Sequence, residues 1–294
     1  NYSQGVISAA GESGGNHIGG VAGQLSGADI SLTNDRSSMD ITIDSYANNV
    51  GGLIGQIGAA KTVVSDSFAT GSISVSGFSQ NTGGLVGNAG GDDISFTNSY
   101  STGSIEIDDS AQFIGGFAGF LGGIFNISHC YAAADINALN TSGSNYYIGG
   151  FVGYFGGAGT FDQNYAIGSI NAPGTQMVGG LIGFTNSSVT NSYAQVDVSA
   201  DSQVGGLIGY FVYTDQEGFE VSNSYSTGAV TGNDELGGLI GMADPDTVVT
   251  NSFWDIQASG QTVSAGGTGE ETAAMQSQNL YLNAGWDMQD IWSI

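Results

Sequence analysis

Short stretches of alternating apolar and polar residues recur along this chain and are separated by glycine. Residues 71–75 (Gly-Ser-Ile-Ser-Val), 103–107 (Gly-Ser-Ile-Glu-Ile) and 189–198 show the alternation most clearly. A period of two is typical of β-strands with one buried face. Between these stretches the pattern Gly-Gly-apolar-apolar-Gly occurs eight times, at intervals of 26 to 34 residues. Its first glycines are Gly19, Gly51, Gly83, Gly115, Gly149, Gly179, Gly205 and Gly237.

A second anchor, Asn-Ser-aromatic in its fullest form, lies between the glycine motifs. A unit of about 30 residues made of short strands cannot bury a face alone, whereas stacked copies share one core. We therefore predict an all-β fold, a β-solenoid or β-helix-like stack of repeats over residues 1–253, with neighbouring strands about 4.8 Å apart. Equivalent aromatic residues would form one column: Phe68, Tyr100, Tyr131, Tyr165, Tyr193, Tyr225 and Phe253.

This aromatic column has two interpretations. We predict an internal stack that fills the core, because aromatic side chains bury large areas and pair well across strands. The alternative is an exposed stripe that binds carbohydrate. The asparagines that precede the aromatic residues predict a ladder of turns in which side-chain amides satisfy buried backbone groups. They are Asn34, Asn98, Asn191, Asn223 and Asn251.

The glycine pairs and the insertions follow from the same repeat. We interpret each Gly-Gly pair as a bend or a point of close packing, since no Lys-Ser/Thr follows it as in a phosphate-binding loop. Repeats longer than the minimum carry insertions at 140–146 and 213–218. Insertions in a solenoid emerge as loops, where binding sites commonly lie.

The last segment, residues 254–294, loses the repeat. Thr268-Gly-Glu-Glu271 fits a capping box and predicts one short helix from Glu270 to Asn283. All three tryptophans of the chain lie here: Trp254, Trp286 and Trp292. We predict that the segment is a cap over the open strand edge of the last repeat. A tryptophan platform for sugar stacking is the alternative.

The charge balance limits the partners. The chain has 27 acidic residues and two basic ones, Arg36 and Lys61, for a net charge of −25. Such a surface repels nucleic acid and anionic membranes, and it suits high salt, which screens the repulsion. No apolar run reaches the roughly 18 residues that a spanning helix needs, so we expect no membrane insertion. A single cysteine, Cys130, allows no intrachain disulfide.

Acidic residues also raise the question of metal binding. Oxygen-rich clusters suit calcium, although no EF-hand spacing is present. The weak calcium candidates are Asp92, Asp93, Asp108, Asp109, Asp244 and Asp246. The simpler reading is solvated surface acids, so we expect that no cofactor is required.

For catalysis the inventory is small. The two histidines are His17 and His129. His129 adjoins Cys130, but neighbours on a strand point to opposite faces and do not form a dyad. A glycosidase needs two carboxylates at a suitable separation, which the many acids leave open. We predict that the chain is not an enzyme.

The repeat resembles the GLUG motif of large bacterial surface and secreted proteins. Gly83-Gly-Leu-Val-Gly87 and Gly205-Gly-Leu-Ile-Gly209 carry the resemblance best, and Asn251-Ser-Phe-Trp-Asp255 resembles the segment that often follows such repeats. The resemblance implies a secreted or cell-surface location, often in adhesins or beside enzymatic modules. It supplies no catalytic residues.

Together these features predict a non-catalytic extracellular adhesion module or filament stalk. The partners would be glycans, cell-surface or matrix proteins, or other copies bound end to end. The alternatives are a carbohydrate-binding accessory module and, less favoured, a polysaccharide-acting enzyme.

Overall fold

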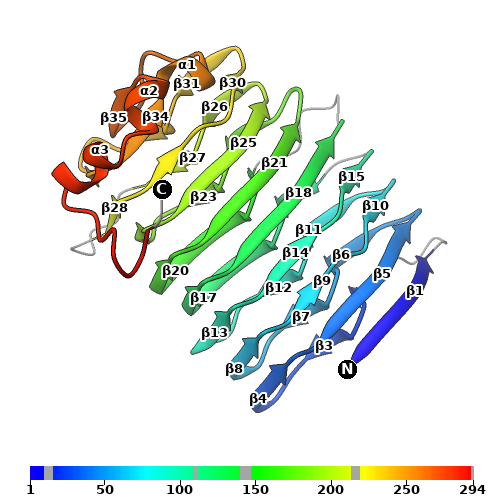
Figure 1. The fold of residues 1–294 in the computed structure, drawn as a ribbon. Coiled ribbons are helices and arrows are strands. Elements are labelled where there is room, and N and C mark those ends of the chain that lie inside the picture. The colour runs from blue at the N-terminus through cyan, green and yellow to red at the C-terminus, as the bar shows by residue number, and fades with distance from the viewer. Residues whose placement is uncertain (10–15, 109–110, 140–146, 213–218, 293–294) are drawn as a thin grey trace.

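The structure is a computed structural model that describes residues 1–9, 16–108, 111–139, 147–212 and 219–292. Its strands pair in parallel and stack along one axis, with the first coil at one end and three short helices at the other (Figure 1). The predicted all-β solenoid is confirmed. Three sheets run the length of the stack.

The short sheet contains the first strand of each coil. Its eight strands pair in chain order: β2 (His17–Gly19), β6 (Ala47–Gly51), β11 (Ser79–Gly83), β16 (Ala111–Gly115), β19 (Tyr147–Gly149), β22 (Gln176–Gly179), β26 (Ser202–Gly205) and β31 (Asp234–Gly237). Each ends on the first glycine of a motif, and these glycines are paired from coil to coil. The predicted register is therefore confirmed.

The long sheet follows directly after the glycine motif. One row is β3 (Ala22–Leu25), β7 (Ile54–Ile57), β12 (Val86–Ala89), β17 (Ala118–Ser128), β20 (Val152–Asp162), β23 (Ile182–Thr185), β27 (Ile208–Phe211) and β32 (Ile240–Ala243). A second row in the same sheet is β4 (Ala28–Thr33), β8 (Ala60–Ser65), β13 (Ile94–Thr97), β24 (Val189–Thr190), β28 (Glu220–Ser222) and β33 (Val248–Thr250).

The ladder sheet begins at the aromatic anchor of each coil. It contains β1 (Tyr2–Ala9), β5 (Arg36–Ile43), β9 (Phe68–Ala69), β10 (Ile73–Val75), β14 (Tyr100–Thr102), β15 (Ile105–Ile107), β18 (Tyr131–Ala138), β21 (Tyr165–Asn171), β25 (Tyr193–Ser199), β29 (Tyr225–Ser226), β30 (Val230–Thr231), β34 (Phe253–Asp255) and β35 (Thr268–Glu270).

From the second glycine motif to the eighth, the two apolar residues are fully buried and form the centre of the core. Leu53, Leu85, Phe117 and Phe151 are all fully buried at one of these positions, and the rings of Phe117 and Phe151 stack 4.5 Å apart. The glycines allow the coils to approach closely. A Cβ atom on Gly84 would lie 2.0 Å from the carbonyl oxygen of Gly116 in the next coil. The prediction of close packing at Gly-Gly thus has a direct steric cause.

The column of asparagines has a different cause from the one predicted. Asn34, Asn98, Asn191, Asn223 and Asn251 all adopt the left-handed conformation, with φ between 45° and 57°. Asparagine tolerates this region better than most residues because its side chain is short and polar. The turn was predicted correctly, but backbone conformation rather than amide bonding to buried groups explains the residue type. Asp66, His129 and Gln163 complete this αL column.

The C-terminal segment covers the last coil, but not with one helix. Thr268–Glu270 forms β35 and pairs with β34, so the predicted capping box at Thr268 is wrong. Three short helices follow the repeat: α1 (Ile256–Ser259), α2 (Thr272–Met275) and α3 (Gln278–Asn283). The edge of β34 binds the segment as a strand because this satisfies its free backbone groups.

Buried aromatic side chains attach this cap to the coils. Trp254 and Trp286 are buried, and their indole N–H groups donate to backbone carbonyls of Gln261 and Asn251. Trp286 packs against Phe253 and Tyr281. These contacts explain two of the three tryptophans as structural.

Candidate functional site

The predicted aromatic column exists, but it lies on the outer face of the solenoid. The rings from Phe68 to Tyr225 stack in sequence, with centroids 4.7–5.0 Å apart and planes within 9° of parallel. Each ring is partly exposed. The prediction of an internal stack is therefore wrong, whereas the column itself is confirmed. Phe253 continues the register, but its ring is buried against the cap.

The alternation of side chains explains why the rings point outward. In β25, Ala194, Val196 and Val198 face the core. Tyr193 therefore shares the outer face with Gln195, two residues further along the strand. The alternation in residues 193–198 is visible in the sequence and predicts this direction, although the size of an aromatic side chain favours burial.

The inner position before each aromatic residue holds a small polar residue instead. At Ser192 and Ser224, the hydroxyl donates to the carbonyl two residues earlier and accepts from a backbone N–H of the preceding coil. This inner ladder comprises Asp35, Ser67, Ser99, Cys130, Asn164, Ser192, Ser224 and Ser252. It satisfies backbone groups on the inner side of the turn between the long sheet and the ladder sheet.

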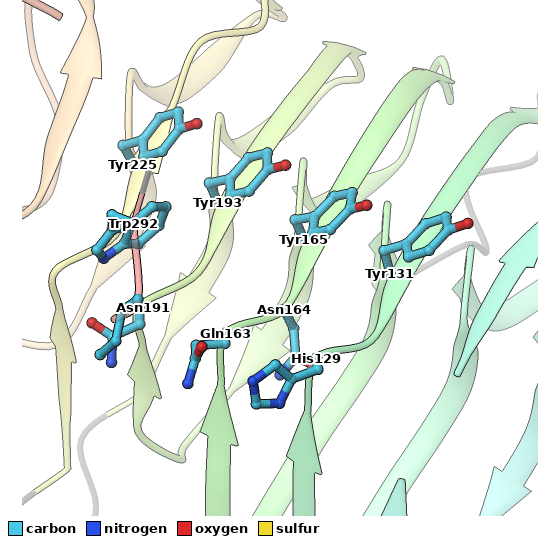
Figure 2. A pocket seen from close by; sticks show the side chains of 10 residues that line it. His129, Tyr131, Gln163, Asn164, Tyr165, Asn191, Tyr193, Tyr225 and Trp292 are labelled. Atoms are coloured by element: carbon cyan, nitrogen blue, oxygen red, sulfur yellow. The ribbon is translucent and has the colours of Figure 1, made fainter. Parts of the chain in front are cut away.

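A groove of about 400 Å³ lies on the outer face between the tyrosines and the αL column. Figure 2 shows two rows across the stack: the parallel rings of Tyr131, Tyr165, Tyr193 and Tyr225, and the side chains of His129, Gln163 and Asn191. Asn164 lies between them and Trp292 stands at one end. Sequence reasoning missed this groove because Trp292 comes from the distant tail.

The ring column ends differently at its two ends. Trp292 lies 5.8 Å from Tyr225 and 6.2 Å from Tyr193, centroid to centroid, and is tilted by 49° to both. At the other end the Arg36 guanidinium lies 5.3 Å from the ring centre of Phe68, a cation–π distance. Arg36 is exposed and occupies the position at which the other coils carry an aromatic residue.

The groove is neutral and rich in hydrogen-bonding groups. Burial raises the pKa of Tyr193 to about 12 and also raises the pKa of Tyr131, Tyr165 and Tyr225, so the hydroxyls stay protonated at physiological pH. The described lining residues include no Asp, Glu, Lys or Arg. Asp162, which is half-buried, accepts hydrogen bonds from the side-chain amides of Gln163 and Asn191, and no described residue donates to either amide oxygen.

A second group of partly exposed aromatic residues lies where the short sheet meets the long sheet. Phe120, Tyr154 and Phe184 stack 4.8–5.0 Å apart along the coils. Phe113 and Tyr147 stack on each other and meet this column edge to face. These residues were not predicted, since they occur in the middle coils only and lie outside the repeating anchors.

The calcium candidates are dispersed over the described structure. Asp92, Asp93, Asp108 and Asp246 are exposed, whereas Asp244 accepts a hydrogen bond from the Tyr210 hydroxyl. Asp109 lies outside the described residues, as do the insertions at 140–146 and 213–218. No group of three potential metal ligands occurs within the described residues. Calcium binding stays a prediction, which melting curves with calcium and with EDTA would test.

The neighbouring His129 and Cys130 point in opposite directions. His129 is exposed in the groove, whereas Cys130 is fully buried in the inner ladder. Burial raises the pKa of the Cys130 thiol to about 12. A thiol held in its neutral form is a poor nucleophile, so this pair supplies no catalytic dyad.

Comparisons with known proteins agree with the repeat. The GLUG motif matches residues 78–106 and 174–199. The chain contains GLUG repeats. Over 121 residues it is 36% identical to a Gly-rich membrane protein of Evansella cellulosilytica, a match that covers 40% of this chain and 10% of that protein. No solved structure matches the chain.

The matched relative raises the question of a membrane span. None of the helices in the described ranges has the length and apolar character needed to cross a bilayer. The findings support a surface or repeat protein, and the relative's name refers to a membrane protein.

Proposed function

We propose that this GLUG-repeat chain is a non-catalytic, extracellular adhesion module. The observation that carries the proposal is the external groove, in which a tyrosine recurs from coil to coil beside a row of polar side chains. Repetition along a rigid stack is suited to holding an extended partner through many weak contacts. The surface location draws support from the relative named as a membrane protein.

The groove also supports a binding role over catalysis. Glycoside hydrolysis uses two carboxyl groups roughly 5–10 Å apart on either side of the bond. No carboxylate occurs among the described residues that line the groove. Its one histidine, His129, is exposed and stands beside Gln163 rather than a nucleophile (Figure 2). A polysaccharide-acting enzyme is therefore the less favoured alternative.

The proposal is tested by measuring adhesion of the purified chain to immobilised bacterial cells, extracellular polysaccharide and matrix protein. We expect saturable binding to at least one surface without release of soluble products. Absence of saturable binding to every surface, or steady cleavage of a polysaccharide, would contradict the proposal. Sedimentation at increasing concentration tests the further prediction of end-to-end self-association.

A further inference from the structure

We propose that the groove binds a neutral glycan chain along the solenoid axis, with one end of the glycan against Trp292. This inference rests on the proposed adhesion function and names the ligand class for it. Three observations carry it: the row of tyrosine hydroxyls, the pairing of the strands beneath, and the absence of charge among the described lining residues.

The hydroxyl row repeats at the spacing of the coils. Tyr131, Tyr165, Tyr193 and Tyr225 lie in successive coils, and their hydroxyls point in the same direction (Figure 2). None of these four hydroxyls donates to a described residue, whereas those of Tyr210 and Tyr281 are bonded to Asp244 and to the carbonyl of Met275. The four hydroxyls thus form one row of repeated donors, and the amide groups of Gln163 and Asn191 belong to a second row on the other side of the rings (Figure 2). A chain with hydroxyl groups on every unit matches such a surface.

The strands beneath the groove disfavour a peptide as the ligand. Extended peptides bind sheets mainly by pairing with a free strand edge. The groove crosses β18, β21 and β25, and each of these strands is already paired on both sides. A ligand here meets side chains only, so an extended peptide would not gain the main-chain pairing that usually holds it to a sheet.

The lack of charge selects a neutral glycan. The two basic side chains of the protein, Arg36 and Lys61, do not line the groove. The Asp162 carboxylate lies against the amides of Gln163 and Asn191, and the whole chain carries a net charge of −25. Uronic acid or sulfated chains would be repelled without a compensating cation. Hydroxyl and amide groups can hydrogen-bond an uncharged partner without the cost of removing water from a charged group.

Trp292 forms the end of the site. The four tyrosine faces are covered by one another, so the ladder presents ring edges and hydroxyls rather than faces. The indole of Trp292 is tilted to this stack and lines the groove. Trp286 supports this indole, with ring centroids 4.6 Å apart, and we assign Trp292 to the contact with the apolar face of a terminal sugar ring.

The test is titration of the complete chain with neutral oligosaccharides (cello-, xylo- and manno-oligosaccharides) and with anionic oligogalacturonate. We expect saturable binding of a neutral oligosaccharide and none of oligogalacturonate. The double variant Tyr165→Phe/Tyr193→Phe removes two hydroxyls and keeps the stack, since phenylalanine already occupies this column at Phe68. The loss expected is about fivefold per hydroxyl, or about 25-fold for the pair. Trp292→Ala should weaken binding about tenfold or more.

The matched control is Tyr154→Phe. Tyr154 stacks between Phe120 and Phe184 outside the groove. The affinity of the Tyr154→Phe variant for the oligosaccharide should therefore equal that of the unchanged chain. Equal affinity of the double variant and the control would overturn the site, and tight binding of oligogalacturonate would overturn the ligand class. Adhesion to cells with no binding of any neutral glycan would overturn the inference and leave the adhesion proposal standing. Loss of both would reject both.

Discussion

The spacing of the coils at the glycine motif can be tested by adding one methyl group. In Gly84→Ala the new Cβ atom would lie 2.0 Å from the carbonyl oxygen of Gly116 and 3.0 Å from Ser101. Reaching even 3.0 Å from that oxygen requires the two backbones to part by about 1 Å, given that closer contacts are essentially never seen. The adjacent hydrogen bonds, Gly84 N–H to Gly115 and Leu85 N–H to Phe117, are 3.1 and 2.8 Å long and would be weakened or lost.

The cost has two parts. Overpacking of a well-packed site costs about 1–3 kcal/mol. Each buried hydrogen bond that is lost adds about 1 kcal/mol or more. The free energy of unfolding should thus fall by about 3–5 kcal/mol, and the melting temperature by about 6–10 °C at roughly 2 °C per kcal/mol for a chain of this size.

The assay is thermal and urea unfolding followed by circular dichroism, with Gly90→Ala as the matched control. Gly90 belongs to the same coil, and its nearest atoms to a new Cβ are 3.7 and 3.9 Å away. Alanine there should be neutral or slightly stabilising, because it restricts the unfolded chain. If Gly84→Ala had the same melting temperature as Gly90→Ala, close backbone contact at the motif could not be what sets the distance between coils.

Three other outcomes follow from the structure. Ser224→Ala leaves the Ser192 N–H without its acceptor, whereas the Ser222 carbonyl still accepts from the Asn191 N–H, so the change should cost about 1–3 kcal/mol in urea unfolding. Cys130→Ser, which restores the usual residue of the inner ladder, should be neutral or stabilising, and equal effects of the two substitutions would argue against the ladder. Folding raises the pKa of Tyr193 and of Tyr281 to about 12, so the contribution of these neutral phenols to the free energy of unfolding is complete below about pH 10 and is lost as the pH approaches 12. Tyrosinate absorbance should therefore rise at a higher pH in the folded chain than in urea. Coincident titration curves would contradict the burial of these two residues. With a net charge of −25, the melting temperature should rise as NaCl is raised from about 10 mM to about 1 M, and a fall would show that repulsion is not limiting.

The sequence allowed the register of the fold to be predicted. Glycine at Gly84 and Gly116 is required by backbone contact, and the repeat spacing aligns these residues from coil to coil. The alternation of apolar and polar residues predicted the strands, because stacked coils must bury equivalent positions. These features are local and repeated, so each copy confirms the others.

The direction of the tyrosines and the form of the cap were harder to predict. The size of an aromatic side chain favours burial. Tyr193, however, lies on the same face of its strand as Gln195 and points outward, whereas Ser192 points inward. The tail formed β35 because a neighbouring strand edge stabilised an extended conformation that local helix signals could not anticipate. The groove joins coils to Trp292 from the tail, and no repeat pattern encodes such a contact.

The central claim is that the tyrosines of the ladder lie on the outside of stacked coils, and hydroxyl-radical footprinting with mass spectrometry tests it most directly. Tyr131 and Tyr165 should be oxidised readily in the folded chain, whereas Tyr281, only 1% exposed, should be protected until the chain unfolds. Protection of Tyr131 and Tyr165 to the same degree as Tyr281 would place the ladder inside and contradict the account.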